Sequence, residues 1–207
     1  MEKLDLTKAY KAYYTATNQP ALIDIPAASF LSIEGLGDPS GQQYADKLQA
    51  LYSVAYTVKF MCKALGKDFT VAKLEGLWSF DENKYAQLSM AEASVKVPRA
   101  EWRYRTMIRM PEFVTSEQVG IAVQQVLDKK QISLVKEITL FQMTEGKSVQ
   151  MLHIGPFANE PETLQTMMEF IQLHGLKKNG LHHEIYLSDF RKTAPEKLRT
   201  ILREPVK

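Results

Sequence analysis

The residues best suited to chemistry lie close together near the end of the chain, in the segment HHEIY at residues 182–186. On a β-strand, successive side chains point to opposite faces, so Glu184 and Tyr186 would share one face, and His183 and Ile185 the other. A carboxylate can accept a proton as a general base, and a phenol can donate a hydrogen bond to a carbonyl or a developing oxyanion. Glu184 and Tyr186 are therefore candidate catalytic residues, provided that their face borders an apolar cleft.

A second carboxylate, Glu75, lies in the apolar segment LEGLW at residues 74–78. We expect this strand to be the counterpart of the strand that carries Glu184, so that the two carboxylates face each other across one cleft. Such a pair could activate a water molecule or attract a lipophilic cation. The alternative is that each glutamate is a solvated strand residue or forms a structural ion pair.

Aromatic residues that could hold a flat ligand lie in the first half of the chain. Trp78, Trp102 and Tyr104 belong to strand-like runs, with Trp102 and Tyr104 on one face by alternation. Tyr52 and Tyr56 are one helical turn apart. Aromatic walls offer a large contact area and attract a cation with about 0.5–2 kcal/mol. These five residues are candidate ligand contacts, and plain core packing is the competing interpretation for each.

The histidines do not form a metal-binding pattern. His182 and His183 are adjacent, so on a strand they would point to opposite faces, and His153 and His174 add no spacing of the H-E-x-x-H type. The glycines of residues 35–37 (GLG) lack the later glycine or the Lys-Ser/Thr pair of a nucleotide-binding loop. No serine or cysteine lies in a nucleophile-elbow sequence. We expect neither a metal nor a cofactor.

The composition is that of an ordinary globular domain. The chain has 207 residues, of which 45% are hydrophobic and 24% charged, and its net charge is +2. The basic residues are scattered, so we expect no direct contact with nucleic acid. No apolar run approaches the roughly 20 residues of a membrane-spanning helix, and the charged first residues do not resemble a secretory signal. Cys62 is the single cysteine, so no internal disulfide can form and we expect a cytoplasmic protein without a membrane partner.

Hydrophobic periodicity and end signals predict three helices, at residues 44–65, 116–129 and 160–174. The second begins with the capping-box pattern TSEQ. Short runs rich in β-branched and aromatic residues predict strands at residues 30–34, 71–78, 102–109, 135–141, 148–154, 183–187 and 198–203. We interpret residues 81–99 as an inserted loop or lid.

The two halves of the chain match each other at three places in the same order. RTMIRMP at residues 105–111 resembles RTILREP at 199–205, FLSIEG at 30–35 resembles MLHIGP at 151–156, and KLEGLW at 73–78 lies where the second half has HHEIYL at 182–187. Self-similarity in a fixed order indicates a duplicated unit, although strand composition alone can produce short matches. The matching makes Glu75 and Glu184 equivalent.

The duplication predicts the architecture of the chain. We expect residues 1–207 to form a single α+β domain of two pseudo-twofold strand-helix-strand-strand modules, at about 21–111 and about 132–207. The sequence leaves the oligomeric state open.

Nearly the whole chain resembles the GyrI-like small-molecule-binding family, in its stand-alone, two-module bacterial branch. The resemblance rests on residues 74–78 and 102–111, on HIGPF at residues 153–157, and above all on HHEIYLSD at 182–189 followed by APEKLRTILR at 194–203. The resemblance implies that the two modules form one antiparallel sheet, with helices on one face and a central ligand cleft at their junction. Phe157 and His153 would lie near that cleft, His153 either orienting other residues or making a structural hydrogen bond.

Members of this family sense drugs within transcription activators, inhibit gyrase or, in the stand-alone branch, hydrolyse the cyclopropane ring of DNA-alkylating natural products. The first strand-like run lies near Leu22, which leaves no room for an N-terminal helix-turn-helix, so we do not expect the activator role. The resemblance implies a cofactor-independent hydrolase of planar, electrophilic, cyclopropane-bearing genotoxins. Tyr186 would polarise the conjugated carbonyl, and Glu184 or Glu75 would direct water onto the ring. The alternatives are a module that sequesters hydrophobic, cationic drugs without turnover, and a gyrase-inhibitor-like interaction protein.

Overall fold

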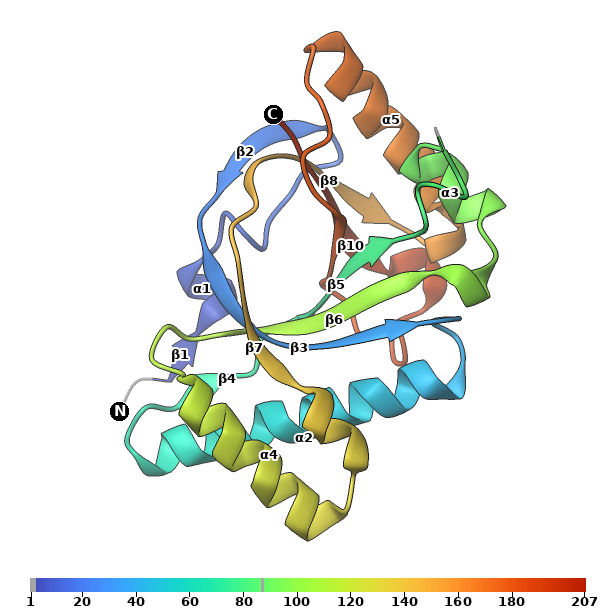
Figure 1. Ribbon diagram of the computed structural model, residues 1–207. Coiled ribbons are helices and arrows are strands. Elements are labelled where there is room, and N and C mark those ends of the chain that lie inside the picture. The colour runs from blue at the N-terminus through green and yellow to red at the C-terminus, as the bar shows by residue number, and fades with distance from the viewer. Residues whose placement is uncertain (1–2, 87) are drawn as a thin grey trace.

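The computed structural model describes residues 3–86 and 88–207 of the chain (Figure 1). Its helices are α1 (Leu6–Ala9), α2 (Gln42–Ala64), α3 (Met90–Lys96), α4 (Ser116–Lys130) and α5 (Glu160–Leu173), with 3-10 turns η1 (Arg99–Glu101), η2 (Ser133–Glu137), η3 (Phe157–Asn159) and η4 (Pro195–Lys197). Its strands are β1 (Leu4–Asp5), β2 (Ala21–Ile25), β3 (Ala28–Leu36), β4 (Phe69–Thr70), β5 (Leu74–Ser79), β6 (Arg103–Met110), β7 (Thr139–Met143), β8 (Gly146–Ile154), β9 (His182–Tyr186) and β10 (Arg199–Pro205). The α+β class is confirmed.

Eight of these strands form one antiparallel sheet in the order β2-β8-β10-β9-β5-β6-β3-β7. The two central strands are β5 and β9. Outward from them, the strands follow as β5-β6-β3 on one side and as β9-β10-β8 on the other, so that β5, β6 and β3 correspond to β9, β10 and β8. Each side is built from a strand, a helix and two strands in chain order, with α2 in the first unit and α5 in the second. The predicted pseudo-twofold arrangement is therefore confirmed.

The outermost strands cross over between the two units. β2 precedes the first unit in sequence but pairs with β8 of the second, and β7 precedes the second unit but pairs with β3 of the first. Each unit thus completes the sheet of the other. This exchange ties the two halves into one sheet, as the ribbon of Figure 1 shows.

The strand registers fix which residues of the two units are equivalent. Thr106 and Thr200 hold matching places in the segments RTMIRMP and RTILREP. Thr106 pairs with Gly76, and Thr200 pairs with Tyr186. Gly76 is therefore the counterpart of Tyr186.

Glu75 consequently corresponds to Ile185 and not to Glu184, so the predicted equivalence of the two carboxylates is wrong. Directly opposed residues of an antiparallel pair share a face of the sheet, and Glu75 opposes Ile185 whereas Glu184 opposes Gly76. The two carboxylates point to opposite faces. The sequence match was one residue out of register, and a slip of one residue moves a side chain to the other face.

Helices α2 and α5 cover the face that carries Glu184. Trp78 shares that face, and Tyr44 of α2 stacks on it with ring centroids 6.2 Å apart. From the other unit, Leu164 of α5 packs with Leu202, which opposes Glu184 in the sheet. The space between α2 and α5 therefore lies over the central strands, as predicted for the ligand cleft.

The N-terminal segment with α1 covers the opposite face, inside the curl of the sheet (Figure 1). The ring of Tyr13 lies under two guanidinium groups, those of Arg109 and Arg203, at 4.6 and 4.5 Å from its centroid. These arginines hold matching positions in the two units, and both are buried. Tyr13 thus makes a cation–π contact with one arginine of each unit.

Local signals placed most elements correctly, with two exceptions. Residues 135–141, predicted as a strand, begin in the 3-10 turn η2, and only β7 from Thr139 onward is extended. The predicted loop at residues 81–99 contains α3, which has a capping box between Ser89 and Glu92. No helix in the described part of the chain is both long and apolar enough to cross a membrane.

Candidate functional site

A cavity of about 380 Å³ lies on the helix-covered face, between α2, α3, α5 and the central strands. Its walls include four aromatic rings: Tyr44, Trp78, Trp102 and Phe157. Its polar side chains come mainly from β9 and the start of α5: His182, Glu184, Tyr186 and Glu160. The predicted residues Glu184, Tyr186, Trp78, Trp102 and Phe157 therefore meet at one site.

Trp78, Tyr186 and Glu184 form a directed chain of hydrogen bonds. Trp78 Nε1 donates to Tyr186 Oη at 3.0 Å, and Tyr186 Oη donates to Glu184 Oε2 at 2.7 Å. An indole N–H can only donate, so the proton of Tyr186 is the one shared with Glu184. Burial and the charge of Glu184 raise the pKa of Tyr186 well above its ordinary value, which keeps the phenol protonated. Tyr186 orients Glu184, and its proton is not free for a ligand carbonyl.

His182 lies between two carboxylates. Its Nδ1 is 2.7 Å from Glu204 Oε1, and its Nε2 is 3.4 Å from Glu184 Oε1, an ion-pair distance without hydrogen-bond geometry. Burial lowers the pKa of His182, but Glu204 and Glu184 outweigh burial and raise that pKa to about 10. The ring is therefore an imidazolium at neutral pH.

Glu160, the first residue of α5, is a carboxyl group that the sequence gave no reason to select. Its side chain lines the cavity with only 8% of the residue exposed, and its Oε1 has no hydrogen-bond partner among the described residues. Burial, together with repulsion from Glu184, raises the pKa of Glu160 well above its ordinary value, and His182 offsets this only in part. The surroundings of Glu160 thus favour its neutral, protonated form.

Because Gly76 has no side chain, Trp78 and Tyr186 can approach each other to hydrogen-bonding distance next to it. A Cβ atom at Gly76 would lie 2.9 Å from Trp78 Nε1 and 3.2 Å from Tyr186 Oη. Because Gly76 and Tyr186 hold equivalent places in the two units, the glycine of one unit makes room for the tyrosine of the other. The site is therefore asymmetric although the sheet is pseudo-symmetric.

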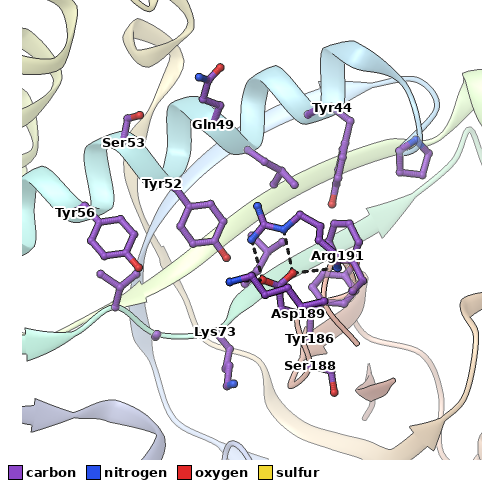
Figure 2. Close-up of a pocket in the computed structure, with 18 of the residues that line it drawn as sticks. Tyr44, Gln49, Tyr52, Ser53, Tyr56, Lys73, Tyr186, Ser188, Asp189 and Arg191 are labelled. Carbon is purple, nitrogen blue, oxygen red and sulfur yellow. Dashed lines mark hydrogen bonds and ion pairs between the residues drawn. The ribbon is translucent and has the colours of Figure 1, made fainter. Parts of the chain in front are cut away.

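Two other predicted aromatics lie in a second, outer groove of about 940 Å³, which runs along α2 (Figure 2). Tyr52 and Tyr56 are stacked there with ring centroids 6.4 Å apart. The Asp189–Arg191 ion pair lies across the groove from them (Figure 2). The groove adjoins the cavity through shared lining residues, which include Tyr44, Tyr186 and Phe190.

Tyr104 and His153 support the site without lining it. Tyr104 packs against Trp78 and Tyr44, with ring centroids 5.7 and 4.9 Å away, and so backs the aromatic wall. His153 Nε2 lies 3.2 Å from the Pro156 carbonyl oxygen, and its Nδ1 lies 2.9 Å from Thr163 Oγ1. The carbonyl can only accept, so Nε2 donates, and His153 fastens the β8 turn to α5. Its role is the structural hydrogen bond.

Glu75 belongs to a buried cluster on the opposite face, so its predicted place in the cleft is wrong. The hydroxyls of Tyr13 and Tyr14 donate to its carboxylate, and His183 Nε2 lies 3.0 Å from Glu75 Oε2. The residue has no exposed surface. His182 and His183 point to opposite faces, as predicted, and each pairs with different carboxylates. No three His, Cys, Asp or Glu side chains gather as a metal site within residues 3–86 and 88–207.

Sequence reasoning missed four residues of the site, and only one had left a signal. His182 is two residues before Glu184, so the period of two already places it on the face of Glu184. Glu204, Glu160 and Tyr44 come from other elements, and only the tertiary structure brings them to β9.

The model of the GyrI-like small molecule binding domain family matches residues 18–207. The chain belongs to the GyrI-like family. A crystallised hydrolase from Listeria innocua is 37% identical over 100% of both chains, with a TM-score of 0.85. An uncharacterized conserved protein from Listeria innocua is 36% identical over 99% of this chain and 100% of its own, with a TM-score of 0.88.

More distant relatives share the fold of this GyrI-like protein. The EcmrR C-terminal domain has a TM-score of 0.57 at 13% identity, over 91% of this chain and 97% of its own. No curated protein matches the chain significantly. The chain is a small-molecule-binding GyrI-like domain, and the aromatic cavity is its best-formed candidate site.

Proposed function

We propose that this GyrI-like domain binds planar hydrophobic molecules in its cavity and hydrolyses those that carry an electrophilic cyclopropane ring. Such a reaction would protect the cell from DNA-alkylating compounds. The observation that carries the proposal is the placement of Glu184 at an aromatic cavity, oriented by Tyr186 at 2.7 Å and beside the imidazolium of His182 at 3.4 Å. The full-length similarity to a Listeria innocua hydrolase supports a hydrolytic activity.

The aromatic walls account for binding. Trp78 and Trp102 meet edge to face with centroids 6.3 Å apart, and Phe157 packs edge-on against Tyr186 at 5.9 Å. Rings held by their neighbours lose little side-chain entropy when a flat ligand packs on them. The cavity therefore favours rigid, planar molecules over flexible ones.

Glu184 would act on water. As the water oxygen attacks the cyclopropane methylene carbon, Glu184 accepts the proton that water releases. The strained C–C bond breaks, and its electron pair moves through the conjugated ring to the carbonyl oxygen, which takes up a proton to become a phenol. Tyr186 fixes the orientation of Glu184. Release of ring strain supplies much of the driving force, so modest catalysis suffices.

A second candidate function is sequestration of lipophilic cations. It is favoured by the charge of the site, in which Glu184 and Glu204 flank the single imidazolium of His182. Aromatic faces next to excess negative charge attract cations. In this case the carboxylates would be counter-ions and no bond would break.

One experiment separates the two functions. The purified protein is incubated with a planar, cyclopropane-bearing alkylator, and the products are analysed by mass spectrometry. We expect catalytic conversion to a ring-opened product that has gained one water. Recovery of unchanged compound, bound one to one, would contradict hydrolysis and favour sequestration.

A further inference from the structure

We infer that Glu160 is the proton donor of this cavity: a buried carboxylic acid that hydrogen-bonds a carbonyl oxygen of the ligand and protonates it as the ring opens. The hydrogen bond identifies the ligand class as neutral planar molecules with a carbonyl acceptor. The proton transfer rests on the proposed hydrolysis, whereas the hydrogen bond does not.

The position of Glu160 carries this inference. The residue begins α5 and lines the cavity together with Glu184 and Tyr186. It is 8% exposed, and its Oε1 lacks a hydrogen-bond partner in residues 3–86 and 88–207. Buried polar atoms are nearly always paired, so an unpaired one in a binding cavity marks a place that a ligand atom can complete.

Every element around Glu160 bears on its charge. β9 contributes Glu184 and His182, whose effects oppose each other, and β10 contributes Glu204, which is already paired with His182. α2 contributes Tyr44, a phenol whose pKa is raised by burial and by Glu184, so it remains neutral. The remaining cation is on η1.

That cation, Arg99, does not neutralise Glu160. Its side chain is 68% exposed, and Nη1 lies 3.8 Å from Asp38 Oδ1 at the surface. The dipole of α5 favours a negative charge at its first residue, by typically 0.3–1 kcal/mol when exposed. Burial of the carboxyl and the nearby charge of Glu184 act in the opposite direction and prevail. The surroundings of Glu160 therefore favour its protonated form.

Two other donors of the cavity, Trp78 and Tyr186, are already engaged. Trp78 Nε1 donates to Tyr186, and Tyr186 Oη donates to Glu184. His182 is the counter-ion of two carboxylates and is 1% exposed. Glu160 Oε1 and His182 Nε2 are the two buried polar atoms of the cavity without a hydrogen-bond partner in residues 3–86 and 88–207, and of these two residues Glu160 is the one that forms no ion pair there.

With Glu160 as the donor and Glu184 as the acceptor, each proton that moves in the hydrolysis has a named source and a named destination. Glu160 gives its proton to the carbonyl oxygen, while Glu184 receives the proton of the attacking water. The ring-opened product carries both a phenol and a hydroxymethyl group. At this stage Glu184 is protonated and Glu160 is ionised. Transfer of that proton from Glu184 to Glu160 across their shared cavity restores the starting state.

The hydrogen bond can be tested without turnover, with fluorenone and fluorene as probes. These flat molecules differ by a carbonyl in place of a methylene. Their ratio of dissociation constants is measured in the wild type, in Glu160→Met and in Glu162→Met, an exposed matched control in the same helical turn. We expect the preference for fluorenone to fall about five-fold in Glu160→Met, the size of one net hydrogen bond, and to persist in Glu162→Met.

Infrared spectra of bound fluorenone provide a second readout. The carbonyl stretch should lie at lower frequency in the wild type than in Glu160→Met, and the acid band of a protonated carboxyl should disappear in the variant. An unchanged fluorenone preference in Glu160→Met, or its loss in His182→Gln alone, would overturn the inference. Glu160→Met and His182→Gln are each checked for a cooperative melting transition above the assay temperature before binding is measured.

Proton transfer is tested with Glu160→Gln, which keeps a donor but has no transferable proton. We expect Glu160→Gln to turn over the cyclopropane substrate ~10²–10⁴-fold more slowly than the wild type and to retain the preference for fluorenone. The control variant Glu162→Gln should keep full activity. The wild-type rate should also decline as pH rises through the raised pKa of Glu160, and this decline should be missing in the variant. Full turnover in Glu160→Gln refutes the proton-donor role. A wild type without hydrolysis refutes the proposed function, while the fluorenone ratio still decides the role of Glu160.

Discussion

Glu75 and Glu184 lie on the two neighbouring central strands, yet their carboxylates point to opposite faces of the sheet. Glu184 lines the cavity, whereas Glu75 is enclosed by Tyr13, Tyr14 and His183. Under the proposed function, Glu184 acts in the chemistry, whereas the buried contacts of Glu75 contribute to stability. Substitutions at the two positions should have separable effects.

For Glu184→Gln, we expect turnover to fall by ~10²–10⁴-fold, because the amide cannot accept the proton of water. Binding of a neutral planar ligand and the melting temperature should change little. If Glu184 is instead the counter-ion of a sequestering module, cationic ligands should weaken selectively. Steady-state rates and ligand titrations distinguish these results.

Glu75→Gln is the matched comparison. We expect a loss of about 1–3 kcal/mol in the free energy of unfolding, because the buried tyrosine and histidine donors lose their charged acceptor. Turnover per folded molecule should be retained. Urea unfolding and activity at low temperature measure the two effects, and an inactive but fully stable Glu75→Gln protein would move the chemistry to the other face.

Gly76→Ala tests the convergence of Trp78 and Tyr186. The new methyl group would lie 2.9 Å from Trp78 Nε1, so the hydrogen bond between the two rings should break and the orientation of Glu184 should loosen. We expect lower turnover together with changed tryptophan fluorescence. The control is Gly120→Ala in α4, where a Cβ meets nothing within 4 Å and helix propensity predicts a gain of about 0.5–1 kcal/mol. Wild-type activity in Gly76→Ala would show that the hydrogen-bond chain is not needed.

His182 makes stability depend on pH. Its pKa is about 10 in the folded protein and about 6.5 when unpaired, so the folded state holds the extra proton between these values. This contribution is complete below pH 6.5 and is lost as pH rises to 10. In urea unfolding, His182→Gln should therefore lose less stability than the wild type over this range, although it is less stable at neutral pH. The exposed His174→Gln serves as control, and parallel curves for the wild type and His182→Gln would refute the prediction.

The outer groove predicts a preference for extended ligands. A ligand whose planar head fills the cavity can place a second planar unit against Tyr52, because the groove and the cavity share Tyr44 and Tyr186. Tyr52→Ala should weaken such a two-unit ligand about three- to ten-fold and leave a compact one unaffected. Phe60→Ala, an exposed aromatic of α2 that is not part of the groove, is the control. Equal losses for both ligands would contradict a separate role for the groove.

Much of the fold could be predicted from local patterns. The helices predicted at residues 44–65, 116–129 and 160–174 correspond to α2, α4 and α5, with ends that differ by one or two residues, because periodicity and capping residues act within one or two turns. The period of two placed Glu184 and Tyr186 on one face, and the structure brings them to a hydrogen bond. The order of the matching segments predicted two units, and the family resemblance implied that the units share one sheet.

The register and the long-range partners were decided only by the tertiary structure. Whether Glu75 faces Glu184 depends on a single-residue choice of pairing between β5 and β9, which packing of both faces settles and local sequence does not encode. Glu160 and Glu204 reach the neighbourhood of β9 from elements that the sequence separates from it by about twenty residues on each side. The protonation state of a buried acid depends on those neighbours. The sequence could therefore identify Glu184 and Tyr186 as candidate residues, whereas the three-dimensional arrangement determines which groups of the cavity hold the protons.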